Sequence, residues 1–140
     1  MMHRAAVGLA VLSHLLAWGA LLWLVFYPNY YQGVGETIVA PGTAPRVETS
    51  VSASLIAVNG WSVLRVLIVP PVLSGVGLVS VWLSEPTRGA KALQWFSALL
   101  LFGFCVLGAF SIGVFYVPAA VALLTAVVLE AGRRVATESR

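Results

Sequence analysis

Apolar residues run along this chain in stretches long enough to cross a lipid bilayer. Residues 5–27 are interrupted only by Ser13, His14 and two glycines, and residues 62–84 form a second apolar stretch. A helix needs about 20 apolar residues to cross about 30 Å of hydrocarbon, so each stretch predicts one transmembrane helix. The first stretch is longer than the apolar part of a secretory signal, and no A-x-A-like cleavage site follows it, so we expect it to be retained.

A third apolar stretch covers residues 92–129 and is too long for one crossing. As a single helix it would measure about 57 Å, nearly twice the thickness of the hydrocarbon. We expect the chain to turn back at residues 111–113, because Gly113 tolerates a turn and Pro118 suits the first turn of a new helix. The pattern therefore predicts helices over residues 93–110 and 114–131. Residues 1–140 are then one all-α membrane domain, a bundle of four transmembrane helices.

The composition agrees with a membrane protein and excludes other classes. Of the 140 residues, 60% are hydrophobic and only 9% are charged, whereas soluble domains are about 45–50% apolar and about 25% charged. So few charges cannot cover a water-soluble globule, and disordered chains have the opposite composition. The net charge of +3 comes from basic residues beside apolar stretches. These are typical topology signals, so we expect the lipid bilayer, and no nucleic acid, as a partner.

Basic residues are divided unequally between the two expected ends of the bundle. One end receives only Arg46, with Arg65 near the mouth of the second helix. The other end receives Arg4, Arg88, Lys91, Arg133, Arg134 and Arg140. Because Lys and Arg are enriched in cytoplasmic loops, we expect both termini in the cytoplasm and residues 28–61 on the opposite side.

The segment of residues 28–61 is the main polar part of the chain. Polar and apolar residues alternate over residues 46–55 with the period of two that is typical of a half-buried strand. Residues 37–39 could supply a second strand, and Asn59 with Gly60 would end the strand and begin the second helix. The alternatives are a short β-hairpin on the outer ends of the helices and a wholly flexible loop.

His14 is predicted near the bilayer centre, where ionisable side chains are costly and commonly functional. It could bind a ligand or carry a proton, or it could be a neutral imidazole that hydrogen-bonds to a neighbouring helix. A haem ordinarily needs a second strong ligand, and the other histidine, His3, is predicted outside the membrane. We therefore expect no metal, haem or other cofactor. The single cysteine, Cys105, excludes an intrachain disulfide.

Arg65 lies one turn into the second predicted helix, where it could contact a substrate anion or take one of two structural positions. Its side chain could extend outward to the interface, or it could pair with Glu36 or Glu48 and hold the loop on the bundle. Pro70 and Pro71 lie inside the same helix and remove two backbone amides, which predicts a kink or an unwound turn. Such a break either shapes a helix for packing or hosts a binding site, as in transporters.

Glu130 lies at the expected cytoplasmic end of the last helix. Arg133 and Arg134 follow it by three and four residues, the spacing at which opposite charges meet on a helix surface. We therefore interpret Glu130 as an interfacial charge that pairs with one of them, and not as a buried carboxylate.

Tyr30 and Tyr31 with Gly33, the sequence LIAVNG over residues 55–60 and a proline-bearing second helix occur in this order. The arrangement resembles small, uncharacterised four-helix membrane proteins of bacteria. The resemblance covers most of the chain, and it implies this architecture and a bacterial cytoplasmic membrane but no activity. Small multidrug transporters also have four helices, but they rely on a membrane-embedded glutamate in the first helix, where this chain has His14.

Two classes of function follow from these observations. The chain has no phosphate-binding loop, catalytic triad, carboxylate pair or HExxH motif, so we expect no enzyme. The first hypothesis is an accessory or interaction subunit that binds a membrane-protein partner through Tyr30, Tyr31, Glu36, Glu48, Trp61 and Arg65. The second is a small homo-oligomeric transporter or channel that uses His14 and the break at Pro70 and Pro71.

Overall fold

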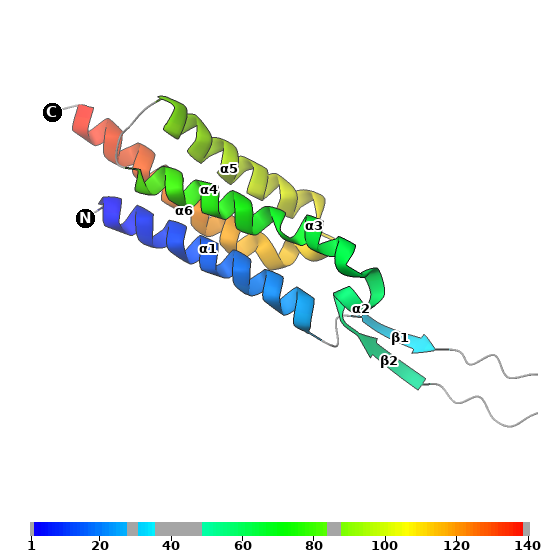
Figure 1. Cartoon of the computed structure of the whole chain (residues 1–140). Helices are drawn as coiled ribbons and strands as arrows, with labels where there is room; N and C mark the ends of the chain where they lie inside the picture. The colour runs from blue at the N-terminus through cyan, green and yellow to red at the C-terminus, as the bar shows by residue number, and fades with distance from the viewer. Residues whose placement is uncertain (1, 28–30, 36–48, 84–87, 139–140) are drawn as a thin grey trace, which may run out of the picture.

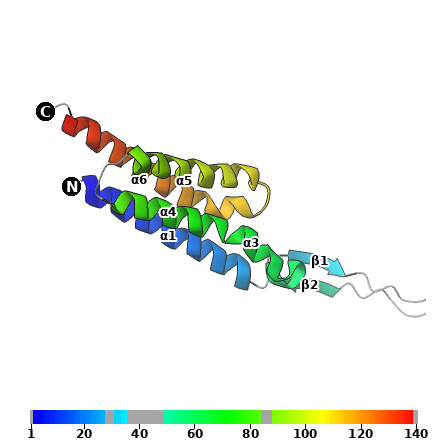
Figure 2. The same cartoon turned by 45° about the horizontal axis from the view of Figure 1, so that its top comes forward.

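Four long helical stretches dominate the computed structural model, which describes residues 2–27, 31–35, 49–83 and 88–138 (Figure 1). The elements in chain order are α1 (Met2–Phe26), β1 (Tyr31–Gly35), β2 (Thr49–Ala53), α2 (Leu55–Asn59), the 3-10 turn η1 (Trp61–Val63), α3 (Leu64–Leu67), α4 (Val69–Trp82), α5 (Arg88–Leu107), the 3-10 turn η2 (Ile112–Tyr116) and α6 (Val117–Glu138). The long stretches lie side by side, and both ends of the chain lie at the same end of the bundle (Figure 2).

The four stretches are long and apolar enough to cross a membrane, which confirms the four long apolar helices expected from the pattern. They are His3–Phe26, Trp61–Trp82, Arg88–Leu107 and Ile112–Arg133. The third helix begins earlier than predicted, and α6 continues beyond the predicted end of the fourth. Polar residues extend these helices, and a search for apolar runs does not register them.

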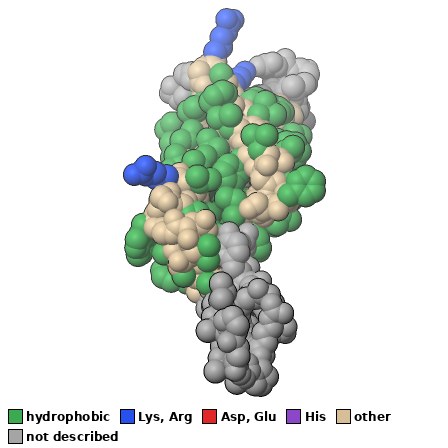
Figure 3. Space-filling model, turned by 90° about the vertical axis from the view of Figure 1, so that its right-hand side faces the viewer, with side chains coloured by type: hydrophobic (Ala, Val, Ile, Leu, Met, Phe, Trp, Pro, Cys, Tyr) green, Lys and Arg blue, Asp and Glu red, His purple; other side chains and the backbone are tan. Residues whose placement is uncertain are grey.

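Hydrophobic side chains cover the outside of the bundle. On the face shown in Figure 3 they occupy much of the surface, between patches of backbone and other side chains, and Lys and Arg project at the margins. The exposed side chains include large ones such as Leu107 at the end of α5, Phe110 in the turn after it and Trp82 at the end of α4. An apolar surface of this extent is unusual for a soluble monomer and suits contact with lipid.

Small residues allow α1 and α6 to pack closely. Ala10 and Ala17 of α1 are fully buried, as are Ala119 and Ala126 of α6. Between them, the Ser13 hydroxyl donates a hydrogen bond of 2.7 Å to the Ala119 carbonyl oxygen. In lipid, helices associate through close packing and interhelical hydrogen bonds, because apolar burial gives no preference for protein over lipid.

The turn between α5 and α6 begins at Gly108, earlier than the predicted break at residues 111–113. The Gly108 carbonyl oxygen accepts hydrogen bonds from the amides of Ser111 at 2.9 Å and Gly113 at 2.8 Å. These two bonds reverse the chain and end the third helix at Leu107 rather than at residue 110. Gly113 is needed for close approach: a Cβ added there would lie 2.6 Å from the Cys105 carbonyl oxygen.

We expect Gly113→Ala to destabilise the bundle by about 1–3 kcal/mol, because the methyl group would meet backbone atoms that cannot move aside. Gly103→Ala is the matched control, since a Cβ at Gly103 meets nothing within 4 Å. The free energy of unfolding in detergent, measured by titration with a denaturing detergent, should fall for Gly113→Ala only. Equal effects of the two substitutions would contradict this account of the turn.

Two short strands lie in the segment between the first two spans. β1 pairs with β2 in antiparallel register, with Tyr31 opposite Ala53 and Gly35 opposite Thr49. β2 falls inside the segment in which polar and apolar residues alternate. The strand that pairs with it is β1, whereas the partner predicted at residues 37–39 lies outside the described residues.

The predicted end of the second strand is wrong, because residues 55–59 form the helix α2. Ser54 caps this helix: its hydroxyl oxygen accepts a hydrogen bond of 3.3 Å from the Ala57 amide. Leu55 is only 2% exposed and belongs to the bundle core. The Ser54 cap and the burial of Leu55 therefore favour a helix at residues 55–59, although the alternating pattern predicts a strand.

Candidate functional site

His14, the candidate intramembrane polar residue, bonds to its own helix and to α4. The Trp18 Nε1 atom lies 3.1 Å from His14 Nε2, and His14 Nδ1 lies 3.1 Å from the Ser74 hydroxyl oxygen. The Ser74 hydroxyl donates to the Pro71 carbonyl oxygen at 2.9 Å. The histidine thus belongs to a chain of hydrogen bonds that joins α1 to the first turn of α4.

The donors in this chain decide the tautomer of His14. Indole Nε1 can only donate, so His14 Nε2 must accept, and the proton of a neutral ring is therefore on Nδ1. Nδ1 then donates to the Ser74 oxygen, and the Ser74 hydrogen is used on Pro71. Both ring nitrogens are occupied, which agrees with the interpretation of His14 as a structural imidazole.

The second span is interrupted at Ile68, as Pro70 and Pro71 predict. Both prolines lie in the first turn of α4. A regular helix would use the amide of residue 71 to bond the Leu67 carbonyl oxygen, but proline has no amide hydrogen. The Tyr116 hydroxyl supplies the missing donor and lies 3.1 Å from that oxygen. Tyr116 is fully buried and packs edge-on against Phe104. A side chain of the fourth span therefore supplies the hydrogen bond that Pro71 cannot make.

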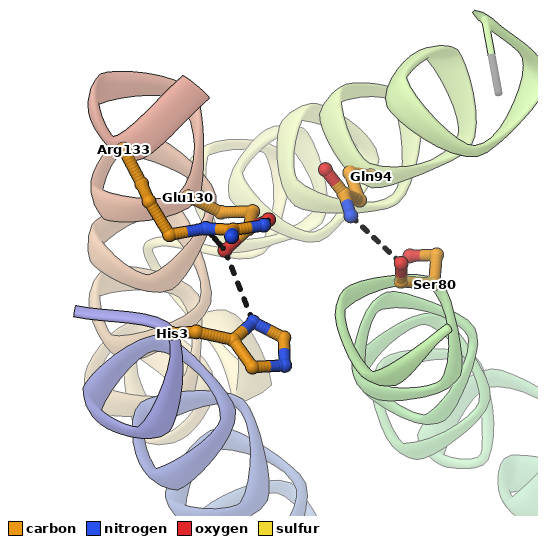
Figure 4. A network of polar contacts seen from close by, with 5 residues as sticks. All are labelled: His3, Ser80, Gln94, Glu130 and Arg133. Atoms are coloured by element: carbon orange, nitrogen blue, oxygen red, sulfur yellow. Dashed lines mark hydrogen bonds and ion pairs between the residues drawn. The ribbon is translucent and has the colours of Figure 1, made fainter. Parts of the chain in front are cut away.

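Glu130 is buried, and its interpretation as an interfacial charge is wrong. Its side chain is only 2% exposed. Arg133 holds it with two bonds, from Nη2 to Oε1 at 2.5 Å and from Nε to Oε2 at 3.1 Å, which confirms the predicted pairing. His3 Nδ1 lies 3.3 Å from the same Oε2 atom and approaches from α1 (Figure 4).

The contact between His3 and Glu130 joins residues at opposite ends of the chain, so no local spacing indicates it. The packing of α1 on α6 brings the two side chains together and removes the carboxylate from solvent. A paired, hydrogen-bonded charge is the form in which a buried carboxylate is tolerated. The cluster therefore fastens the beginning of α1 to the end of α6.

Gln94 is a second buried polar residue that the sequence analysis missed. It is 3% exposed, and its Nε2 atom donates a hydrogen bond of 2.7 Å to the Ser80 carbonyl oxygen, from α5 to α4 (Figure 4). The signal was available, because an amide inside an apolar helix needs a partner from another helix.

Of the six residues predicted to bind a partner, only Trp61 and Arg65 are placed with their side chains. Tyr30, Glu36 and Glu48 lie outside the described residues, and Tyr31 is placed as a backbone position of β1. Of the other two, Trp61 is 72% exposed at the start of the second span, and Arg65 is exposed one turn further on. The tether between Arg65 and a loop carboxylate therefore stays a prediction.

Chemistry-bearing groups do not converge on one cavity in the part of the chain that the structure describes. Each buried side-chain nitrogen or oxygen there has a hydrogen-bond partner, and no three His, Cys, Asp or Glu side chains are grouped so as to hold a metal. An open, apolar hollow of about 440 Å³ is lined by Gly19, Leu22, Trp23 and Phe26 of α1 and by Tyr27, which follows the helix.

Comparisons of the chain with protein-family models, with curated proteins and with solved structures find no match.

We expect Tyr116→Phe to destabilise the bundle by about 1–3 kcal/mol, because it leaves the buried Leu67 carbonyl oxygen without a donor. In a Pro71→Ala background the loss should be much smaller, since the amide of an alanine can bond that oxygen. A double-mutant cycle on the free energy of unfolding in detergent measures the difference. Equal losses in both backgrounds would show that the hydroxyl does not replace the missing amide.

Proposed function

We propose that the protein is a non-enzymatic integral membrane protein that binds a partner protein through the segment between its first two spans. The observation that carries the proposal is the position of the β1–β2 pair. It projects beyond one end of the bundle, away from the apolar surface of the helices (Figure 1, Figure 2).

The base of the strand pair is attached to the bundle. Leu55 follows β2 closely and is buried in the core, and Ser54 caps the helix that carries it. This anchor supports the presentation of β1 and β2 at a defined place. Exposed strand edges are surfaces to which another chain can add by backbone hydrogen bonds.

Exposed side chains beside the strand pair support the same proposal. Trp61 and Arg65 are four residues apart on one helical stretch, and both are exposed. Tryptophan and arginine are enriched among the residues that dominate binding energy at protein interfaces. Together with Tyr30, Tyr31, Glu36 and Glu48 of the sequence analysis, they form the proposed binding segment.

The proposed location is a bacterial cytoplasmic membrane with both termini in the cytoplasm. The unequal distribution of Lys and Arg in the sequence supports this orientation. The strand pair would then lie on the outer side, where an envelope or membrane-protein partner can reach it.

The transporter hypothesis receives less support from the contacts inside the bundle. Both nitrogens of His14 are used by Trp18 and Ser74, and the carbonyl freed by Pro71 is bonded by Tyr116. A transporter would need such groups to be open to a substrate.

The orientation predicts the accessibility of introduced cysteines. In a Cys105→Ser background, Ser50→Cys in β2 should react with a membrane-impermeant thiol reagent applied to intact cells. Gly89→Cys, at the start of α5, should react only after the cells are opened. Reaction of the residue at position 50 solely from the cytoplasmic side would overturn the proposed topology.

The partner-binding proposal predicts the pattern of photo-crosslinks in native membranes. A photoreactive residue at position 50 should give a protein adduct of discrete mass, whereas the same residue at the exposed position 99 of α5 should give only lipid adducts. Trp61→Ala should weaken the adduct at position 50 because it removes an exposed anchor, and His14→Ala should leave it unchanged. If His14→Ala abolishes the cellular phenotype while replacement of residues 31–53 preserves it, transport is the better explanation.

A further inference from the structure

One exposed stripe of α5 combines two cations with an apolar track. Arg88, Lys91, Trp95 and Leu99 follow one another at spacings of three and four residues, which places them on one face of the helix. Arg88 and Lys91 are exposed in the first turn, Trp95 is 41% exposed and Leu99 is 58% exposed. The stripe therefore passes from positive charge to apolar surface along the helix axis.

The two cations are not neutralised by the side chains that the structure describes. The first turn of α5 contains no acidic residue, and the described ion pairs do not include Arg88 or Lys91. Glu130 at the same end of the bundle is buried and bound to Arg133 and His3. Like charges three residues apart repel each other, so an anion placed between them is favoured.

We propose that this stripe binds the headgroup of an anionic phospholipid. Arg88 and Lys91 hold the phosphate, and an acyl chain lies along Trp95 and Leu99. The ligand is a lipid rather than a free phosphate because the cations adjoin an apolar track at the end of a membrane-spanning helix, where lipid headgroups and acyl chains meet. The inference is independent of the partner-binding function proposed above.

The charge balance of the sequence supports an anionic ligand at this end. Residues 1–4, 84–91 and 130–140 contain six Lys or Arg and three Glu, whereas residues 28–65 contain two of each sign. Arg65 at the opposite end therefore provides a control cation that is also exposed and also lies near the end of a span.

The test uses the full-length protein in detergent micelles and counts retained lipids by native mass spectrometry. Dioleoyl-phosphatidylglycerol is compared with dioleoyl-phosphatidylcholine at equal concentrations. Each basic residue near a membrane surface adds about fivefold in affinity for anionic lipid, so Arg88→Gln with Lys91→Gln should weaken phosphatidylglycerol binding about 30-fold. Arg65→Gln should change it less than about fivefold, and Arg88→Lys with Lys91→Arg should retain binding.

Three results would overturn the proposal. The first is equal retention of the two lipids by the unmodified protein. The second is a double Gln variant that binds phosphatidylglycerol as well as Arg65→Gln does, with circular dichroism showing that both are folded. The third is displacement of the lipid by millimolar inorganic phosphate, which would assign the two cations to a free anion instead.

Discussion

The structure depends on the rule that a backbone carbonyl inside an apolar bundle must have a donor. Pro71 breaks this rule locally, because it cannot bond the Leu67 oxygen, and Tyr116 restores it from another span. The Leu67 oxygen therefore has a donor although the second span is interrupted there. The hydrogen bond from the Tyr116 hydroxyl also fixes the position of η2 along the bundle axis relative to α3. The position of the turn between α5 and α6 is thereby tied to the position of the prolines.

The same rule accounts for the polar side chains of the bundle. Ser13, Ser74, Ser80 and Gln94 each donate to a backbone carbonyl, on their own helix or on a neighbouring one. His14 instead forms its two hydrogen bonds with the side chains of Trp18 and Ser74. The bonds of Ser13, His14 and Gln94 join neighbouring helices, and together these groups leave few donors for a substrate. Recognition is then expected at the two ends of the bundle, where side chains leave the apolar environment.

The apolar pattern alone was enough to predict the four spans, because the length of an apolar run is a direct consequence of the thickness of the bilayer. The apolar pattern did not predict the residues at which these helices begin and end. Two amide bonds to the Gly108 carbonyl begin the turn after α5, and a Ser54 cap converts residues 55–59 from strand to helix. Such features depend on single hydrogen bonds, which a hydrophobic pattern averages out.

The candidate sites were predictable where the chemistry was local. A histidine in an apolar helix requires hydrogen-bond partners, so the bonds of His14 could be expected. The Glu130–Arg133 pair follows from a spacing of three residues. The burial of Glu130 was not predictable, because it depends on His3 and the packing of α1 against α6. The burial of Glu130 affects the charge at the whole end of the bundle that carries both termini and the first turn of α5. Glu130 is buried and bonds to Arg133 and His3, so it does not neutralise the exposed cation of Lys91. Lys91 is therefore available to the anionic headgroups of the surrounding membrane.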